Sequence, residues 1–380
     1  MRVAFFISAG ILGYCYIVYP FVLAVLPAKR SRATEATVRR AARPQWPSMS
    51  LIVAAYNEER AIRARVRNFL EGRYPGWSEL LIVSDGSTDA TVAEATAIAS
   101  DRVRMIDQKR RRGKAAALET AVPYARGDVL VFTDATSIFH PDALTHLAEK
   151  FADPDIGLVT GKVKAYGPGL VGMYHRFERF LESRESARGV LATAHGCIYA
   201  MRKSLWRSHD PALVDDFLDP IIVSLSDKRS VVAPDAICVE EFPARAQFAR
   251  QIRMVALAAF TLRRLLPEMI RARRWRSIFV VISHKALRWL TVVWLWILAF
   301  ATLHLADQGG IYRIALAAQA AFWMVTLAGA VRSRMGRRGP STIFYDFVSL
   351  NVAGFLGVYR CLAGRAPVVW ETNTEGAGAA

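Results

Sequence analysis

The apolar run at residues 3–26, which contains no charged side chain, constrains this chain more than any other feature of its sequence. About 20 apolar residues in a helix are enough to cross the roughly 30 Å hydrocarbon core of a bilayer. A signal peptide is the alternative, but its apolar region is shorter, and a basic tract follows here in place of a small-residue cleavage site. The run therefore predicts a transmembrane anchor over residues 1–28.

Two later apolar blocks, residues 287–305 and 311–331, are joined by a short polar turn and predict a transmembrane helical hairpin over residues 286–331. Arginine and lysine flank these segments; they are Lys29, Arg30, Arg32, Arg39, Arg40 and Arg43 after the anchor, Arg271, Arg273, Arg274 and Arg276 before the hairpin, and Arg332, Arg334, Arg337 and Arg338 after it. Because basic flanks stay in the cytoplasm, we expect the N-terminus outside and the central domain in the cytoplasm.

Two adjoining stretches leave alternatives open. Residues 341–363 form a third C-terminal membrane segment, but Asp346, Asn351 and Arg360 interrupt it, so it either spans the membrane or lies in its interface. Residues 244–276 mix arginine with phenylalanine, methionine and leucine, which predicts amphipathic interfacial helices; an ordinary surface helix of the soluble domain is the alternative. Residues 364–380 form a polar tail.

The composition agrees with a membrane protein. Hydrophobic residues make up 53% of the 380-residue chain, which argues against a wholly soluble protein. The formal net charge of +17 favours sugar nucleotides, anionic lipid or nucleic acid, but much of the excess lies beside membrane segments, so we expect no nucleic-acid partner. The dispersed cysteines support neither a disulfide scaffold nor a zinc site, and indicate a reducing compartment; they are Cys15, Cys197, Cys238 and Cys361. The alanine- and arginine-rich composition favours a bacterial inner membrane.

The central region, residues 45–243, contains short apolar runs separated by stretches with helical periodicity. The runs lie at residues 50–56, 79–85, 102–107, 128–134 and 156–163. Such a pattern is typical of buried parallel strands in βαβ units and predicts a doubly wound, Rossmann-like α/β domain. In such sheets ligands bind beyond the carboxyl ends of the strands, so the polar residues that end a strand are the first site candidates.

Three of these strand ends carry carboxylates. They comprise Tyr56, Asn57 and Glu58; Asp85, Gly86, Ser87, Thr88 and Asp89; and Thr133, Asp134, Ala135 and Thr136. A single Asp85 is equally well explained as a turn or helix cap. Its recurrence with Asp134 opposite a basic stretch, however, fits a divalent cation, Mg²⁺ or Mn²⁺, that bridges a diphosphate.

A phosphate cradle of the common kinds is absent from the sequence, since no GxGxxG follows the first strand and no GxxxxGK[ST] occurs. Residues 109–114 instead place basic side chains at the expected start of the helix after the third strand. Arg110, Arg111 and Arg112 are best explained as a solvated face or a contact with anionic lipid. Gly113 and Lys114 are better placed for an anion, because glycine permits close approach of the backbone.

These residues, in this order, resemble the family 2 glycosyltransferases, which are inverting enzymes with a GT-A fold and include membrane polysaccharide synthases. The resemblance covers about residues 48–260; its motifs are residues 55–58, 85–89, 113–118, 133–136 and 214–216. It implies transfer of a hexose from a nucleotide sugar, most simply a UDP-sugar, to a lipid-linked or polysaccharide acceptor.

The resemblance also implies roles for individual residues. Asp85, with the backbone near Ala55 and the turn of Tyr56, Asn57 and Glu58, contacts the base or ribose of the donor. Lys114 lies near the diphosphate, and Asp134 stands where the metal-binding DxD motif begins. Asp216 matches the general base that deprotonates the acceptor, and Asp215 takes the place of the Glu before it. A helix N-cap is the alternative explanation for Asp215 and Asp216.

Two departures from the family pattern qualify these roles. Thr136 replaces the second acidic residue of DxD, so the cation rests on Asp134 and the diphosphate. The QxxRW motif of processive members is reduced to Gln251 and Arg253, which keeps a phosphate contact but loses the stacking aromatic. We therefore expect transfer of one or a few sugars, with His195 and Cys197 lining the acceptor pocket. The alternative is an inactive relative that scaffolds an export complex.

Overall fold

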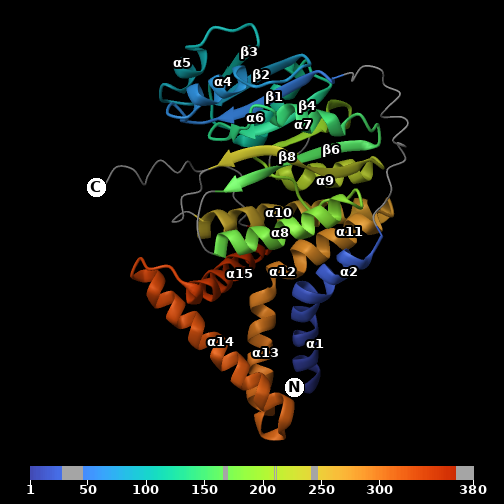
Figure 1. Ribbon diagram of the computed structural model, residues 1–380, viewed down its shortest axis with the longest axis vertical. Coiled ribbons are helices and arrows are strands. Elements are labelled where there is room, and N and C mark those ends of the chain that lie inside the picture. Colours follow the sequence, from blue (N-terminus) through green and yellow to red (C-terminus); the bar gives the residue numbers. More distant parts are fainter. Residues whose placement is uncertain (28–45, 166–169, 209, 211, 241–246, 365–380) are drawn as a thin grey trace.

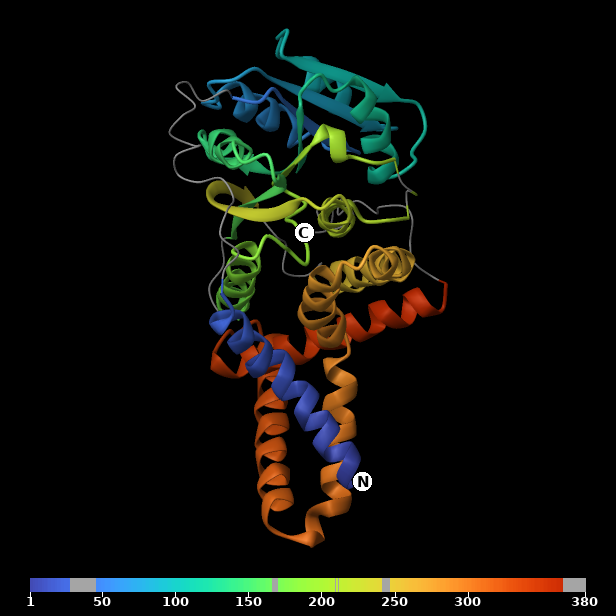
Figure 2. The ribbon, with the colours of Figure 1, turned by 90° about the vertical axis from the view of Figure 1, so that its right-hand side faces the viewer.

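The computed structural model describes residues 1–27, 46–165, 170–208, 210, 212–240 and 247–364. The basic tract at residues 29–43, residues 244–246 and nearly all of the expected tail lie outside these ranges. One end of the molecule is a sheet domain, and the other is a set of long apolar helices (Figure 1). Helices α8, α10 and α11 lie between the two parts (Figures 1 and 2).

The sheet has eight strands in the order β3-β2-β1-β4-β7-β6-β8-β5. The strands are β1 Met49–Ala55, β2 Ser78–Asp85, β3 Val103–Gln108, β4 Val129–Asp134, β5 Ile138–Phe139, β6 Ile156–Ala165, β7 Tyr199–Arg202 and β8 Arg229–Glu240. Strands β1 to β4 pair in parallel, whereas β7 is antiparallel to both β4 and β6. The five predicted strands are confirmed, but the expected parallel sheet is mixed because β7, which the sequence did not predict, separates β4 from β6.

Helices cover both faces of the sheet, as expected for a doubly wound domain. The helices of this domain are α4 Ile62–Leu70, α5 Thr91–Thr96, α6 Lys114–Ala121, α7 Ala143–Lys150, α8 Leu170–Ser186 and α9 Asp215–Leu225. Strand β1 is buried throughout, and its side chains alternate: Leu51 and Val53 pack in one core with α4 and α7, whereas Ile52 and Ala54 pack in the other with α6. Two cores therefore fix the carboxyl edge of β1, β2 and β4.

In the part of the chain that the structure describes, four helical segments are long and apolar enough to cross a membrane by length and composition: Arg2–Val25, Thr291–Gln308, Gly310–Arg334 and Pro340–Leu362. They comprise α1 Arg2–Gly13, η1 Tyr14–Val18 and α2 Tyr19–Val25; α13 Thr291–Leu305 and η6 Ala306–Gln308; α14 Gly310–Arg334; and α15 Pro340–Leu362. Helices α1, α13 and α14 extend away from the sheet domain. Helix α15 lies across their ends and packs on α10 (Figure 2). Whether it spans the membrane or lies in its interface stays a prediction.

The stretch between the sheet domain and the apolar helices is also helical. It comprises α10 Gln247–Arg271, α11 Trp275–Val281, the π-helical turn η5 Ile282–Ala286 and α12 Leu287–Trp289. A small core joins α9 of the sheet domain to α10 and α11 through Phe217, Leu262 and Val281. The base of the sheet domain is thus packed against helices that lead directly into the apolar set.

Candidate active site

Hydrogen bonds join the turn after β1 to the turn after β2. Asn57 adopts a left-handed backbone conformation (φ 53°), and its backbone N–H donates to Ser87 Oγ at 3.2 Å. Its side-chain oxygen accepts a hydrogen bond from the backbone N–H of Thr88 at 2.9 Å. The guanidinium of Arg111 lies 3.9 Å from the centre of the Tyr56 ring, a cation–π contact. Because Ala55 ends β1 directly before this turn, the predicted donor-contacting residues lie together at the sheet edge.

Asp85 ends β2 and is buried beneath the basic loop. Its two carboxylate oxygens accept backbone N–H groups, one from Arg112 and one from Gly113, each at 2.7 Å. Gly113 has φ 94°, which a residue with a Cβ rarely adopts, and α6 begins at the next residue. Asp85 is only 3% exposed, and its two hydrogen bonds hold this loop in place. Its contact with a base or ribose stays a prediction.

Lys114 stands between carboxylates from two halves of the domain. Its Nζ lies 2.8 Å from Asp134 Oδ1, at the end of β4, and 3.9 Å from Asp215 Oδ2, in the first turn of α9. Burial lowers the pKa of Lys114, but the negative charges of Asp134 and Asp215 outweigh burial and raise it overall. Lys114 is therefore a permanent cation at the meeting point of the predicted diphosphate and catalytic residues.

Asp216 lies beside this cluster, against the loop before β7. A Cβ added to Gly196 would approach Asp216 Oδ2 to 2.9 Å, so the glycine leaves room for the carboxylate. Burial, reinforced by the negative charge of Asp215, raises the pKa of Asp216 to about 7. The N-cap of α9 is Val214, with Asp215 and Asp216 in the first helical turn, so the alternative of an N-cap role for these aspartates is wrong.

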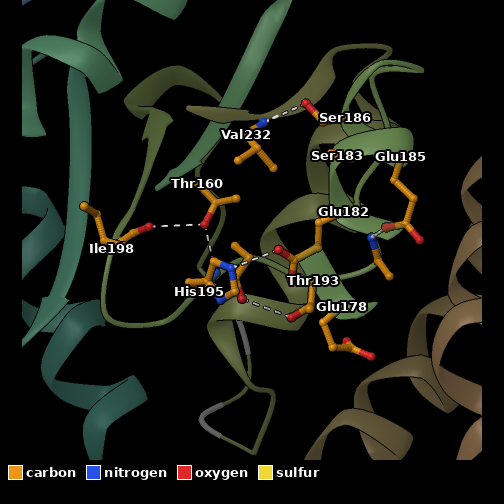
Figure 3. A network of polar contacts seen from close by, with 12 residues as sticks. Thr160, Glu178, Glu182, Ser183, Glu185, Ser186, Thr193, His195, Ile198 and Val232 are labelled. Atoms are coloured by element: carbon orange, nitrogen blue, oxygen red, sulfur yellow. Dashed lines mark hydrogen bonds and ion pairs between the residues drawn. The ribbon is translucent and has the colours of Figure 1, made fainter. Parts of the chain in front are cut away.

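His195, which the sequence singled out, is held from two sides (Figure 3). Its ring Nε2 lies 3.2 Å from Glu182 Oε2 on α8, and its backbone N–H donates to Thr160 Oγ1 at 2.9 Å. Burial lowers the pKa of His195, but the charge of Glu182 outweighs burial and raises it. Cys197 is buried in the core at 5% exposure, and a hydrogen bond with Cys238 raises the pKa of its thiol. Its expected place in the lining of the acceptor pocket stays a prediction.

Two acidic residues near the site, Glu240 and Asp219, were missed by sequence reasoning, whereas Glu58 was predicted in the donor-contacting turn. Glu240 ends β8; burial raises its pKa, and the charge of Asp134 adds to the effect. The pKa of Glu58 rises to about 7 through burial and the charges of Asp134 and Asp89. Asp219 accepts the Tyr199 hydroxyl at 2.9 Å. Glu240 directly follows the short apolar run at residues 236–239 within β8, the same signal that identified Asp85 and Asp134, and this signal was available in the sequence.

Arg253 lies on α10, one turn beyond Arg250, whose guanidinium pairs with Glu240 Oε1 at 3.8 Å. The amino-terminal half of α10 thus approaches the acidic edge of the site through Arg250. Thr136 is exposed after β4. Placement of Arg253 as a phosphate contact stays a prediction.

The residues fit a cation that is shared with a substrate. Among the described residues, no group of three or more His, Cys, Asp or Glu side chains is arranged to hold a metal ion. Mg²⁺ and similar ions are, however, commonly bound by one or two carboxylates together with substrate phosphates. Asp134, 22% exposed at its side chain and facing Lys114, offers one such carboxylate.

Replacing Asp85 by Asn tests its anchoring role. An amide keeps one acceptor but turns a donor toward the second backbone N–H, leaving a buried N–H unpaired at a cost of about 1–3 kcal/mol. We expect a lower thermal unfolding temperature and weaker nucleotide binding, measured by calorimetry with UDP and GDP. Asp101→Asn, at an exposed position, is the control. Unchanged stability together with lost binding would instead assign Asp85 to the nucleotide alone.

Comparison with known proteins places this site in a family. The model of glycosyl transferase family 2 matches residues 50–208. An N-acetylglucosaminyltransferase of Rhizobium leguminosarum bv. trifolii is 32% identical over 146 residues, which are 37% of this chain and 80% of that protein. A UDP-Glc:alpha-D-GlcNAc-diphosphoundecaprenol beta-1,3-glucosyltransferase of Escherichia coli, WfgD, is 32% identical over 91 residues, 24% of this chain and 36% of that protein.

A solved structure is similar over nearly the whole chain. It is a mannosyltransferase from Pyrobaculum calidifontis in complex with GDP-Man and Mn²⁺, with a TM-score of 0.72 and 22% identity, and the match covers 96% of this chain and 99% of that one. This likeness establishes the GT-A fold together with its flanking apolar helices. Since the Rhizobium relative is matched over most of its own length, the chain belongs to glycosyltransferase family 2, and it is a glycosyltransferase.

Proposed function

We propose that the protein is a membrane-bound inverting glycosyltransferase. It moves one or a few sugars from a nucleotide-sugar donor, a UDP-sugar in the simplest case, to a lipid-linked or polysaccharide acceptor. The sheet domain works at the cytoplasmic face of the inner membrane. One observation carries this proposal: Asp216, with its pKa of about 7, lies next to the ion pair of Lys114 and Asp134.

The two parts of this site serve the two ends of an in-line displacement. Asp216 is the general base: it removes the proton from the acceptor hydroxyl as the oxygen attacks the anomeric carbon, and a base with a pKa near the working pH is the most effective. Lys114 faces the leaving diphosphate, where a fixed cation stabilises the developing negative charge. Asp215 and Asp134 hold the Lys114 ammonium in place.

A divalent cation fits beside Lys114. Asp134 would hold it, with the diphosphate of the donor supplying further oxygen ligands. Such an ion supplies Lewis-acid stabilisation of the leaving group. The relative from Pyrobaculum calidifontis was solved with GDP-Man and Mn²⁺, which supports cation use in this fold.

Membrane association is supported by the four apolar helical segments and by the relatives. The name of the Escherichia coli relative describes an acceptor sugar linked to diphosphoundecaprenol, a lipid. Helices α8, α10 and α15 place the sheet domain directly beside the apolar helices (Figure 2). An acceptor that is anchored in the bilayer would therefore reach the site without leaving the membrane surface.

Donor consumption by the full-length protein tests this proposal. The protein, purified in detergent or nanodiscs, is incubated with UDP-, GDP- and dTDP-sugars in Mg²⁺, Mn²⁺ or EDTA, with membrane lipid extract as the acceptor. We expect one nucleotide class to be consumed and EDTA to slow the reaction. An anomeric configuration in the product that is retained from the donor would contradict the inverting mechanism.

A scaffold without catalysis is the second candidate, favoured by the exposed Thr136 in place of a second metal carboxylate. It predicts that calorimetry detects nucleotide binding while no donor is consumed with any acceptor extract. The same donor panel therefore separates the two functions.

A further inference from the structure

A cavity of about 390 Å³ lies where the base of the sheet domain meets the apolar helices. This volume falls within the ~300–1,000 Å³ that small-ligand pockets span. Its wall takes residues from η1, α8, α10, η5, α12 and α15, so it is built by both parts of the molecule. The cavity is separate from the Lys114 cluster, and none of the residues with a proposed catalytic role lines it.

Part of the cavity wall is basic. His284, Lys285 and Arg288 line it, and no carboxylate is found among its described lining residues. Glu178 lies behind the wall and fixes all three cations: its oxygens are 3.0 Å from His284 Nε2, 2.9 Å from Lys285 Nζ and 2.5 Å from Arg288. The Arg288 guanidinium is also 5.4 Å from the centre of the Phe177 ring. Glu185 Oε1 lies 2.7 Å from His284 Nδ1, so His284 is paired on both ring nitrogens. Lys285 and Arg288 share the single carboxylate of Glu178, which leaves an excess of positive charge on this part of the wall.

The rest of the wall is largely apolar. Trp289 of α12 and Phe347 and Leu350 of α15 line it, and α15 is among the segments apolar enough to enter a membrane. A phosphate suits the basic residues, since charge-assisted hydrogen bonds from Lys and Arg to phosphate are strong. A hydrocarbon chain suits the apolar residues. The ligand that matches both parts of the lining is a phosphate carried by a single apolar chain.

The cavity is linked to the acceptor side of the active site along α8. Glu178 holds the basic side chains of the cavity, and Glu182, one helical turn or ~6 Å further along, holds His195 (Figure 3). The loop that carries His195 contacts Asp216, because the backbone N–H of Ala194 donates to the backbone carbonyl of Asp216 at 2.8 Å. On the other side, Gln251 of α10 lines the cavity, next to Arg250, which pairs with Glu240.

We propose that this cavity binds the phosphate end of the acceptor's lipid carrier, so that the hydroxyl presented to Asp216 belongs to a sugar attached to that phosphate. This inference rests on the proposed function and specifies its acceptor: a glycosylated lipid phosphate or diphosphate. Lys285 and Arg288 recognise the phosphate, and α12 and α15 contact the first part of the chain.

Binding of a lipid phosphate, measured without any donor, tests the cavity independently of transfer. The full-length protein in detergent is titrated with tritiated farnesyl phosphate, with farnesol as the neutral match. We expect farnesol to bind at least tenfold more weakly, and inorganic phosphate at equal concentration not to compete. Lys285→Gln should weaken farnesyl phosphate binding at least tenfold. Arg276→Gln, which removes an exposed cation of α11 outside the cavity, should leave it unchanged.

A second variant avoids the ion cluster. Asn351→Phe on α15 should block the cavity while all the contacts of Glu178 remain, and it should abolish farnesyl phosphate binding without lowering the unfolding temperature. Equal binding of farnesol and farnesyl phosphate, or displacement by equimolar phosphatidylglycerol, would overturn the assignment. If farnesyl phosphate binds as expected but no donor is ever consumed, the proposed function fails while the cavity assignment stands.

Discussion

Sugar transfer by the Asp216→Asn variant is expected to fall by ~10²–10⁴-fold, the usual contribution of a general base, while donor binding is retained. The amide has nearly the shape of the carboxylate but cannot take the proton of the acceptor hydroxyl. Gly196, which packs against this side chain, accommodates either group. The measurement is the initial rate of transfer with the identified donor, beside calorimetric titration of the same donor. Asp101→Asn should retain the full rate.

The pH dependence gives this prediction a second readout. Because the pKa of Asp216 is raised to about 7 and the base must be ionised, the rate should be constant well above pH 7 and fall about tenfold for each pH unit below it. The Asp216→Asn variant should lose this limb of the profile. A wild-type rate that stays level down to pH 5 would exclude Asp216 as the base, as would full activity of the Asn variant.

Replacing Lys114 by Gln should cost ~10²–10³-fold in transfer, the range found when one preorganised electrostatic group is removed. The change leaves Asp134, Asp215 and Asp216 without the cation that lies between them. The positive charge of Lys114 opposes the rise in the pKa of Asp216, so its loss should move the acidic limb of the pH profile to higher pH. Affinity for UDP or GDP should fall as well.

Lys150→Gln, at the end of α7, removes the same charge outside the cluster and serves as the control. The decisive comparison is the shift of the pH profile. A variant that merely unfolds has a lower rate at every pH, but the pH at which its rate is half-maximal does not change. A Lys114→Gln enzyme with an unshifted profile and unchanged donor affinity would place the diphosphate elsewhere.

Strand positions followed from the sequence because each buried strand is a continuous apolar run. The runs at residues 79–85 and 128–134 coincide with β2 and β4 to within a residue. The order of the sheet did not follow, since β7 has four residues and no distinctive pattern, yet it lies between β4 and β6. Pairing of that kind depends on contacts between residues far apart in the chain, which local periodicity does not encode.

In the site, too, features with a local signal in the sequence were predicted, and contacts between distant residues were not. Asp85, Asp134 and Lys114 were found because a strand end or a helix start gives a local signal. The contact of Lys114 with Asp215 was implied by family resemblance alone, since about a hundred residues separate the two in the chain. The pairing of Glu182 with His195 was not predicted, because a glutamate within an amphipathic helix resembles any solvent-facing residue until the packed partner is known.

The strand order also determines which parts of the site can form during synthesis on the ribosome. Strands β1 to β4 find their parallel partners among themselves, so this half of the sheet is complete in sequence once residue 134 has been made. Lys114 and Asp134 meet within it, but Asp215 arrives only later, and the edge strand β5 must wait for β8. The proposed general base and the proposed diphosphate-facing cation therefore cannot come together until residue 216 has been made, about eighty residues after that half of the sheet.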